Sequence, residues 1–174
     1  DISNYASPIL ITHNGKKQIV SLTGKSVIGV NPDNGAIEWT FDDWGLAAVE
    51  RGWEKIAPNF PLYKDGQLFV CNGYDIGSFM LKLNDDATAV SLAWRNNDLD
   101  THHGGFVLVD GVIYGSNWIN NTSGNWVAVD WNTGETKYEE TWSGGSSKGS
   151  IIYADNMLYC YDERRGAVGI VKPT

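Results

Sequence analysis

The chain alternates short hydrophobic runs with polar turns along most of its length. Three phrases of very similar pattern are YKDGQLFVCNG at 63–73, LVDGVIYGSNW at 108–118 and YADNMLYCYDE at 153–163. In each phrase an apolar run is followed by an Asp-Gly or Asp-Asn pair and then by a second apolar run. Asp-Gly and Asn-Gly are strong signals for a two-residue hairpin turn, because both central positions need a positive φ. The pattern therefore predicts repeated antiparallel hairpins.

The hairpins recur at a regular interval. Asp65, Asp110 and Asp155 follow one another at a spacing of 45 residues, and an earlier copy at 11–20 carries Asn14-Gly15 in the corresponding place. About six extra residues separate the first copy from the second, and we place them within 42–55. A third strand, a tight turn and a fourth strand ending near an aromatic residue complete most copies. Four strands per unit and a period near 45 residues are typical of a β-propeller blade.

A segment of the third copy carries a family resemblance. Residues 128–138, AVDWNTGETKY, resemble the tryptophan-docking motif of quinoprotein dehydrogenase propellers, Ala-x-Asp-x-x-Thr-Gly-x-x-x-Trp. The matching positions are Ala128, Asp130, Thr133 and Gly134, with Tyr138 in place of the Trp. The first copy matches more loosely and keeps the aromatic residue as Trp39, whereas the second copy ends at Trp94 after a longer turn. The resemblance implies that these residues dock neighbouring blades.

The whole chain is similar to the PQQ-like repeat (quinoprotein alcohol dehydrogenase-like) propellers, in a bacterial branch of that family. The resemblance implies an all-β propeller of four-stranded antiparallel blades. We place the blades at 6–41, 57–96, 103–142 and 148–174, the last without its fourth strand. Because such propellers usually have seven or eight blades, we expect this chain to be about half of one, partnered by the remaining blades; the alternative is that another chain fills the gap. The family is mostly exported, so we expect a periplasmic protein whose leader lies outside this sequence.

Composition and charge exclude several classes of function. The net charge of −8 and the pI near 4.7 argue against nucleic-acid and anionic-membrane partners, which require basic surfaces. No apolar run approaches the roughly 18 residues of a membrane-spanning helix. Cys71 and Cys160 fall on blades that are not neighbours, so we expect two buried free thiols. No CxxC pair or zinc-like histidine spacing is present, so no metal site is expected.

The loops predict which face of the blades binds. Turns between the first and second strands and between the third and fourth are mostly tight, as in Asp-Gly and Asn-Thr-Gly. The long, aromatic loops are the other connections, at 42–55, 73–78, 96–105, 117–125 and 163–166. Those connections share the opposite face of a propeller. Variable loops on one side of a rigid scaffold are typical of a binding face.

Two groups on these loops are candidate ligand-binding residues. His102 and His103 precede an innermost strand, where a histidine could face the axial funnel as a base or polar ligand. The same histidines could instead form a joint between blades. The second group, on successive loops, could hold a sugar, a peptide or an anion; it could equally be a set of solvated loop tips. Its members are Asp75, Trp118, Arg164 and Arg165.

Three functions are compatible with the sequence. The first is a non-catalytic binding or scaffold module for a protein or glycan, with no cofactor expected and no catalytic residue assigned. The second, implied by the resemblance, is a quinoprotein alcohol or polyol dehydrogenase that holds PQQ with calcium. The adjacent cysteine pair and the acidic constellation that often accompany that cofactor are not evident in the sequence. The third is another enzyme, for example one acting on a carbohydrate. We favour the first, because the docking motifs need only serve blade packing and the fold by itself does not imply the dehydrogenase function.

Overall fold

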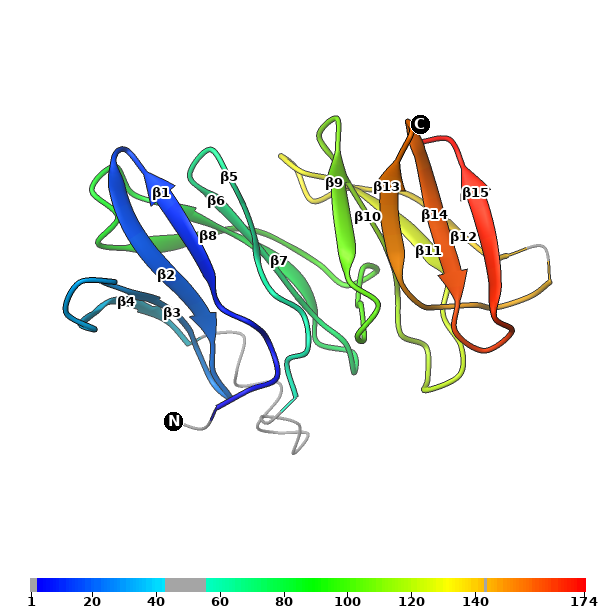
Figure 1. Cartoon of the computed structure of the whole chain (residues 1–174), viewed down its shortest axis with the longest axis horizontal. Helices are drawn as coiled ribbons and strands as arrows, with labels where there is room; N and C mark the ends of the chain where they lie inside the picture. Colours follow the sequence, from blue (N-terminus) through cyan, green and yellow to red (C-terminus); the bar gives the residue numbers. More distant parts are fainter. Residues whose placement is uncertain (1–2, 43–55, 143) are drawn as a thin grey trace. The chain divides into compact units, whose positions relative to one another are not determined.

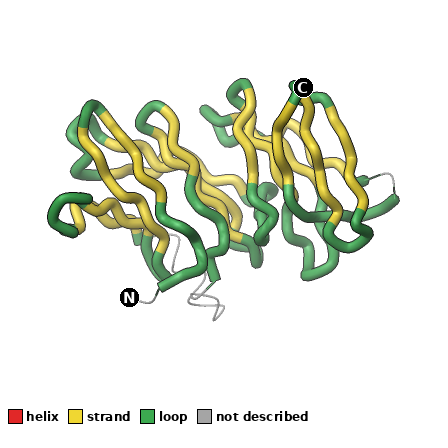
Figure 2. The backbone as a smooth tube through the Cα atoms, viewed as in Figure 1, coloured by secondary structure: helices red, strands yellow, loops and turns green. Residues whose placement is uncertain are grey.

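The computed structural model describes residues 3–42, 56–142 and 144–174 of the chain; the insertion expected within 42–55 lies almost wholly outside them. The described residues form strands joined by loops and turns, with no helix, and thus no helix able to cross a membrane (Figure 2). The strands are β1 Ile9–His13, β2 Lys16–Leu22, β3 Val27–Val30, β4 Ile37–Phe41, β5 Leu62–Lys64, β6 Gln67–Asn72, β7 Gly77–Leu83, β8 Val90–Asn96, β9 Phe106–Val109, β10 Val112–Ser116, β11 Trp126–Asp130, β12 Thr136–Glu140, β13 Ile151–Ala154, β14 Met157–Asp162 and β15 Ala167–Val171.

The strands form four sheets in which neighbours in sequence are neighbours in space (Figure 1). The orders are β1-β2-β3-β4, β5-β6-β7-β8 and β9-β10-β11-β12, followed by a three-stranded sheet β13-β14-β15. The registered pairs are antiparallel. This is the up-and-down arrangement of propeller blades, so the all-β prediction of four-stranded units, with one unit of three strands, is confirmed.

The chain divides into two compact units. Unit 1 comprises Asp1–Cys71 and Phe79–Arg95, and unit 2 comprises Asn72–Ser78 and Asn96–Thr174. In unit 1 the fully buried side chains include Phe69 and Phe79, whose rings pack on Trp94 and Phe41 respectively. In unit 2 a core forms between the last two sheets from Val109, Val112, Tyr114, Ala128, Ile151, Leu158 and Cys160. Each unit thus has its own hydrophobic core.

The two cysteines are buried free thiols, as predicted. Cys160 lies within the unit 2 core, where burial raises the pKa of its thiol to about 11. A thiol with so high a pKa stays protonated at neutral pH, and the thiolate is the nucleophilic form. Cys160 therefore serves as a small apolar packing residue.

The hairpin turns have the backbone geometry that the sequence predicted. The central residues of the turns have φ of 48° and 83° at Asn14-Gly15, 49° and 80° at Asp65-Gly66, 49° and 81° at Asp110-Gly111, and 51° and 60° at Asp155-Asn156. All eight values are positive, as a type I′ turn requires. These local signals set the register of each first hairpin.

Substitutions at Gly111 test how much the positive φ at this turn position contributes to stability. A Cβ added at Gly111 would meet no atom within 4 Å, so substitution costs only backbone strain. We expect Gly111→Ala to lower the free energy of unfolding by about 1 kcal/mol. Gly111→Asn, which copies the fourth hairpin, should cost less than half of that, because Asn tolerates positive φ. Urea denaturation of both variants checks the ranking; equal losses would contradict it.

A five-residue turn occurs three times with the same closing hydrogen bond. In DWNTG the side chain of Asp130 accepts from the backbone N–H groups of Asn132 and Thr133, and the N–H of Gly134 donates to the carbonyl of Asp130. NPDNG begins with Asn31 and DERRG with Asp162, and both repeat the closing bond to a glycine of positive φ. The Asp and Gly of the family-like motif thus form this turn.

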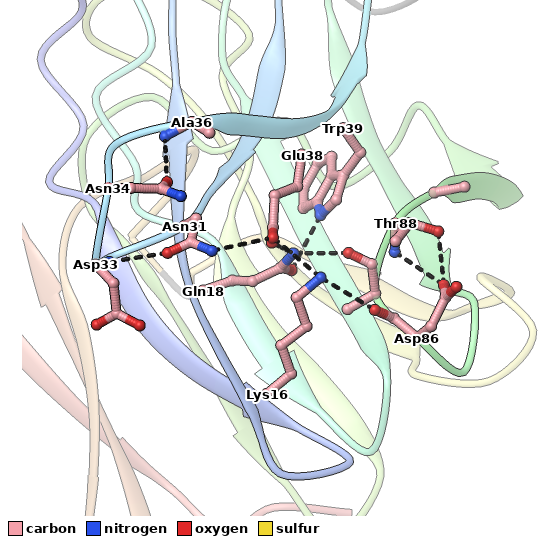
Figure 3. A network of polar contacts seen from close by, with 12 residues as sticks. Lys16, Gln18, Asn31, Asp33, Asn34, Ala36, Glu38, Trp39, Asp86 and Thr88 are labelled. Atoms are coloured by element: carbon pink, nitrogen blue, oxygen red, sulfur yellow. Dashed lines mark hydrogen bonds and ion pairs between the residues drawn. The ribbon is translucent and has the colours of Figure 1, made fainter.

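The indole of Trp39 docks two sheets of unit 1 through a buried glutamine (Figure 3). Trp39 packs against Gly29 on the adjacent strand and donates its Nε1–H to Oε1 of Gln18 at 3.0 Å. The Nε2 of the fully buried Gln18 donates to Glu38 and to the carbonyl of Ala87 in the turn between β7 and β8, the latter at 2.7 Å. Every polar atom of this buried pair therefore has a partner, as burial demands. The docking position expected for Trp39 thus has a defined set of contacts.

Gly29 is essential to this contact. A Cβ at position 29 would lie 2.1 Å from the indole of Trp39, far inside contact distance. We expect Gly29→Ala to lower the free energy of unfolding by about 2–3 kcal/mol through overpacking. Gly144→Ala is the matched control, because its Cβ would meet neighbours only at 3.6 Å or more. Chemical denaturation of both variants checks this, and a Gly29→Ala variant as stable as the control would contradict it.

Candidate functional site

Five loops of unit 2 bring six side chains together, and we name these the loop cluster. The β6–β7 turn supplies Tyr74, the β8–β9 connection two histidines, the β10–β11 loop an indole, the β12–β13 connection a lysine and the β14–β15 turn a glutamate. The members are Tyr74, His102, His103, Trp118, Lys148 and Glu163. Four of these loops are among the connections that the sequence assigned to the long-loop face; the β12–β13 connection, which carries Lys148, is not.

Glycines allow the connections to approach closely. A Cβ at Gly104 would lie 1.9 Å from the carbonyl oxygen of Gly149, so the His102-His103 segment and the Lys148 segment are in backbone contact. A Cβ added at Gly73 would likewise lie only 2.9 Å from the Cα of His102. Residues of ordinary size at these positions would separate the loops. The HHGG sequence is therefore a joint between sheets as well as a carrier of candidate ligand groups.

Four rings of the loop cluster form a continuous aromatic row. Trp118 lies 5.1 Å from Tyr74, Tyr74 lies 4.8 Å from His102 and His102 lies 4.4 Å from His103, between ring centroids. Tyr74, His102 and Trp118 are half-buried and His103 is exposed. Rings that are held by their neighbours and still reach the surface can stack on a ligand at little entropic cost.

Charged groups lie at the histidine end of the row. The side chain of Lys148 is only 2 % exposed, and its Nζ forms an ion pair with Glu163. Glu163 also lies against the exposed His103, with 3.4 Å between Oε2 and Nε2. A buried ammonium without a carboxylate partner is very costly, so this pair also holds the two loops in place. The cluster therefore has an exposed imidazole and a half-buried carboxylate beside a buried cation.

The contacts of His102 define its protonation. The ammonium of Lys148 can only donate, so Nδ1 of His102, 3.5 Å away, is the acceptor. The remaining ring N–H, on Nε2, donates to the hydroxyl of Tyr74 at 2.7 Å. Burial, assisted by His103 and Lys148, lowers the pKa of His102 to about 4, against an opposing effect of Glu163. His102 is therefore neutral at pH 7.

This lowered pKa predicts a pH dependence of stability. Below its ordinary pKa of 6.5, His102 takes up a proton in the unfolded chain more readily than in the folded protein. Acidification from pH 7 to pH 4.5 should therefore lower the free energy of unfolding of the wild-type protein by more than it lowers that of the His102→Gln variant. Urea unfolding of both proteins at the two pH values measures the difference. An NMR titration placing His102 near 6.5 would contradict the prediction.

The remaining predicted residues have other contacts. Arg164 and Arg165 occupy the middle of the DERRG turn, where Arg165 donates to Asp162 and to the carbonyl of Gly144, both at 2.7 Å. The backbone N–H of Asp75 donates to the carboxylate of Asp100 at 2.8 Å. The structure thus brings His102, His103 and Trp118 together, while Arg165 ties its loop to the preceding connection.

Sequence reasoning missed three members of the loop cluster. Tyr74 adjoins the predicted residue Asp75, and Glu163 adjoins the two predicted arginines. Lys148 lies in SGGSSKGS, a composition typical of a linker, where nothing indicates burial. A single cation in a stretch otherwise made of Gly and Ser is the one signal available. Within residues 3–42, 56–142 and 144–174, no group of three or more His, Cys, Asp or Glu is placed to hold a metal ion.

Comparisons with known proteins show the fold alone. No protein-family model matches the sequence, and no curated protein matches it. Among solved structures, the computationally designed Ika4 protein superposes with a TM-score of 0.63 at 12% identity, covering 100% of this chain and 93% of Ika4. The β-propeller domain of Cps50 (Swd1) from Myceliophteria thermophila gives 0.61 at 13% identity, covering 95% and 53%.

A europium-containing methanol dehydrogenase also matches, with a TM-score of 0.58 at 14% identity over 95% of this chain and 39% of that one. The chain therefore has the β-propeller fold, and it spans about half the length of Swd1 and less of the dehydrogenase. A designed protein, a propeller domain and an enzyme share this likeness at similar identity. The likeness supports the fold, and the activity has to be argued from the loop cluster.

Proposed function

We propose that this chain is a non-catalytic binding module of a β-propeller, and that the loop cluster is its binding surface for a glycan or a protein segment. The observation that carries the proposal is the row of four rings beside an exposed imidazole and a half-buried carboxylate. Aromatic faces stack on the apolar faces of sugars and on aromatic or cationic side chains. Glu163 and His103 supply the polar contacts that orient such a ligand.

The chemistry of the cluster favours binding over catalysis. Lys148 is committed to Glu163, and His102 is held in one tautomer by two partners. These contacts fix the rings in place, which lowers the entropic cost of binding. We propose, as an extension, that the protein requires no cofactor and is exported to the periplasm, where glycans and envelope proteins are available.

Removal of one ring tests the proposal. We expect a panel of immobilised oligosaccharides and peptides to yield at least one binder that quenches tryptophan fluorescence. Trp118→Ala should weaken that binding about 5- to 10-fold, as expected for the loss of one stacked ring. Phe60→Ala is the matched control, because Phe60 is an aromatic residue 46% exposed outside the cluster. Circular dichroism verifies that both variants are folded.

Three outcomes would contradict this function. The first is the absence of any binder in the panel, and the second is equal weakening by Phe60→Ala and Trp118→Ala. The third is stoichiometric uptake of PQQ with Ca²⁺ followed by alcohol-dependent dye reduction. That result would make the protein a quinoprotein dehydrogenase.

A further inference from the structure

The burial of the second strand differs between the first and last sheets in chain order, which we call terminal, and the other two. In β6 and β10 consecutive residues are buried, as in Leu68–Asn72 and Val112–Ser116, whichever side of the sheet they point to. In β2 and β14, buried residues alternate with more exposed ones. Because successive side chains point to opposite faces of a sheet, this alternation means that one face of each terminal sheet lacks a cover among the described residues.

The uncovered face of the last sheet is apolar. Ile152, Tyr159 and Ile170 are register partners across β13, β14 and β15, and Tyr161 and Val168 form the adjacent pair. Ile152, Ile170 and Val168 are 60%, 58% and 55% exposed, and Tyr161 is 43% exposed. We name these five residues the β13–β15 open face. Their neighbours Ile151, Leu158 and Cys160 point the other way, into the unit 2 core.

The first sheet has a smaller apolar face of the same kind. Leu10 pairs with Ile19, and Ile19 pairs with Val30, which gives a row across β1, β2 and β3. Leu10 is 64% exposed, and Ile19 and Val30 are half-buried. We name this row the β1–β3 open face. Gln18 and Val20 alternate with it and are buried on the docked side.

A junction inside unit 2 shows what covers such faces. There Tyr114 and Ala128 of the third sheet pack on Ile151, Leu158 and Cys160 of the fourth. The third sheet contributes the side that faces the next sheet in the chain, and the fourth sheet contributes the side that faces the previous one. The β13–β15 open face is the side of the fourth sheet that a next sheet would cover. The β1–β3 open face is the side of the first sheet that a previous sheet would cover. The two open faces are therefore complementary in the same sense as the two sides of that junction.

We propose that the β13–β15 open face of one copy of this chain packs on the β1–β3 open face of a second copy. Both faces are apolar rows, and burying them removes exposed aliphatic and aromatic surface from water. The contact is heterologous, because two different surfaces meet. The likeness to Ika4 over 93% of its length, and to Swd1 over 53%, supports a four-sheet unit that occurs both as nearly a whole chain and as half of a longer one. The inference is independent of the loop cluster.

Sedimentation of the 174-residue chain and three variants tests the proposal. We expect association at about 100 μM, weakened roughly 100-fold or more by Ile170→Glu and by Leu10→Glu, because each places an unpaired charge in an apolar contact. Leu92→Glu is the control, since Leu92 is 40% exposed on a strand outside both faces. Circular dichroism and urea denaturation confirm that all variants fold.

Mixing the two weakened variants gives the sharpest measurement. Ile170→Glu keeps an intact β1–β3 open face and Leu10→Glu keeps an intact β13–β15 open face, so an equimolar mixture should regain one good junction. Restored association supports the proposal. A chain that stays monomeric overturns it and leaves the faces to further blades of a longer polypeptide. Association that survives Leu10→Glu, or is equally weakened by Leu92→Glu, also overturns it.

Discussion

An aromatic ring lying on a glycine is the contact on which the packing of these sheets depends. Trp39 lies on Gly29 in unit 1, and Trp142 lies on Gly169 in unit 2, where a Cβ would come within 2.5 Å of the indole. Each contact lets a large ring fill the space beside a sheet without displacing the strand beneath it. Because interiors are close-packed, neither glycine can gain a side chain without displacing the indole that lies against it.

The loop cluster also depends on a close approach at glycines. Its members come from five separate connections of unit 2, and the backbone contact between Gly104 and Gly149 brings two of those connections together. Lys148 can be buried there because Glu163 reaches it from the next turn. A scaffold of repeated sheets thereby supplies a fixed arrangement of side chains that no single repeat contains.

Local features were predictable from the sequence, and contacts between repeats were not. Asn14-Gly15 and its three counterparts specify their turns through φ alone, so the hairpins could be predicted residue by residue. The two histidines and Trp118 were found because the loops of one face must converge. Lys148 could not be found, since its burial depends on a partner on another strand pair. Arg165 was assigned to a binding rim because its pairing with Asp162 depends on the folded turn.

In the recurring five-residue turn, two of the five residues determine the shape of the backbone. Its shape is set by an Asp or Asn at the start and a Gly at the end, as at Asp130 and Gly134. The three residues between them are left to other uses: in DWNTG one of them is a buried tryptophan, and in DERRG one is an arginine that anchors a neighbouring loop. Repeated units can therefore diverge in sequence at these positions while their strand connections stay the same. A repeat can in this way lose its recognisable sequence pattern while its strands and turns keep their arrangement.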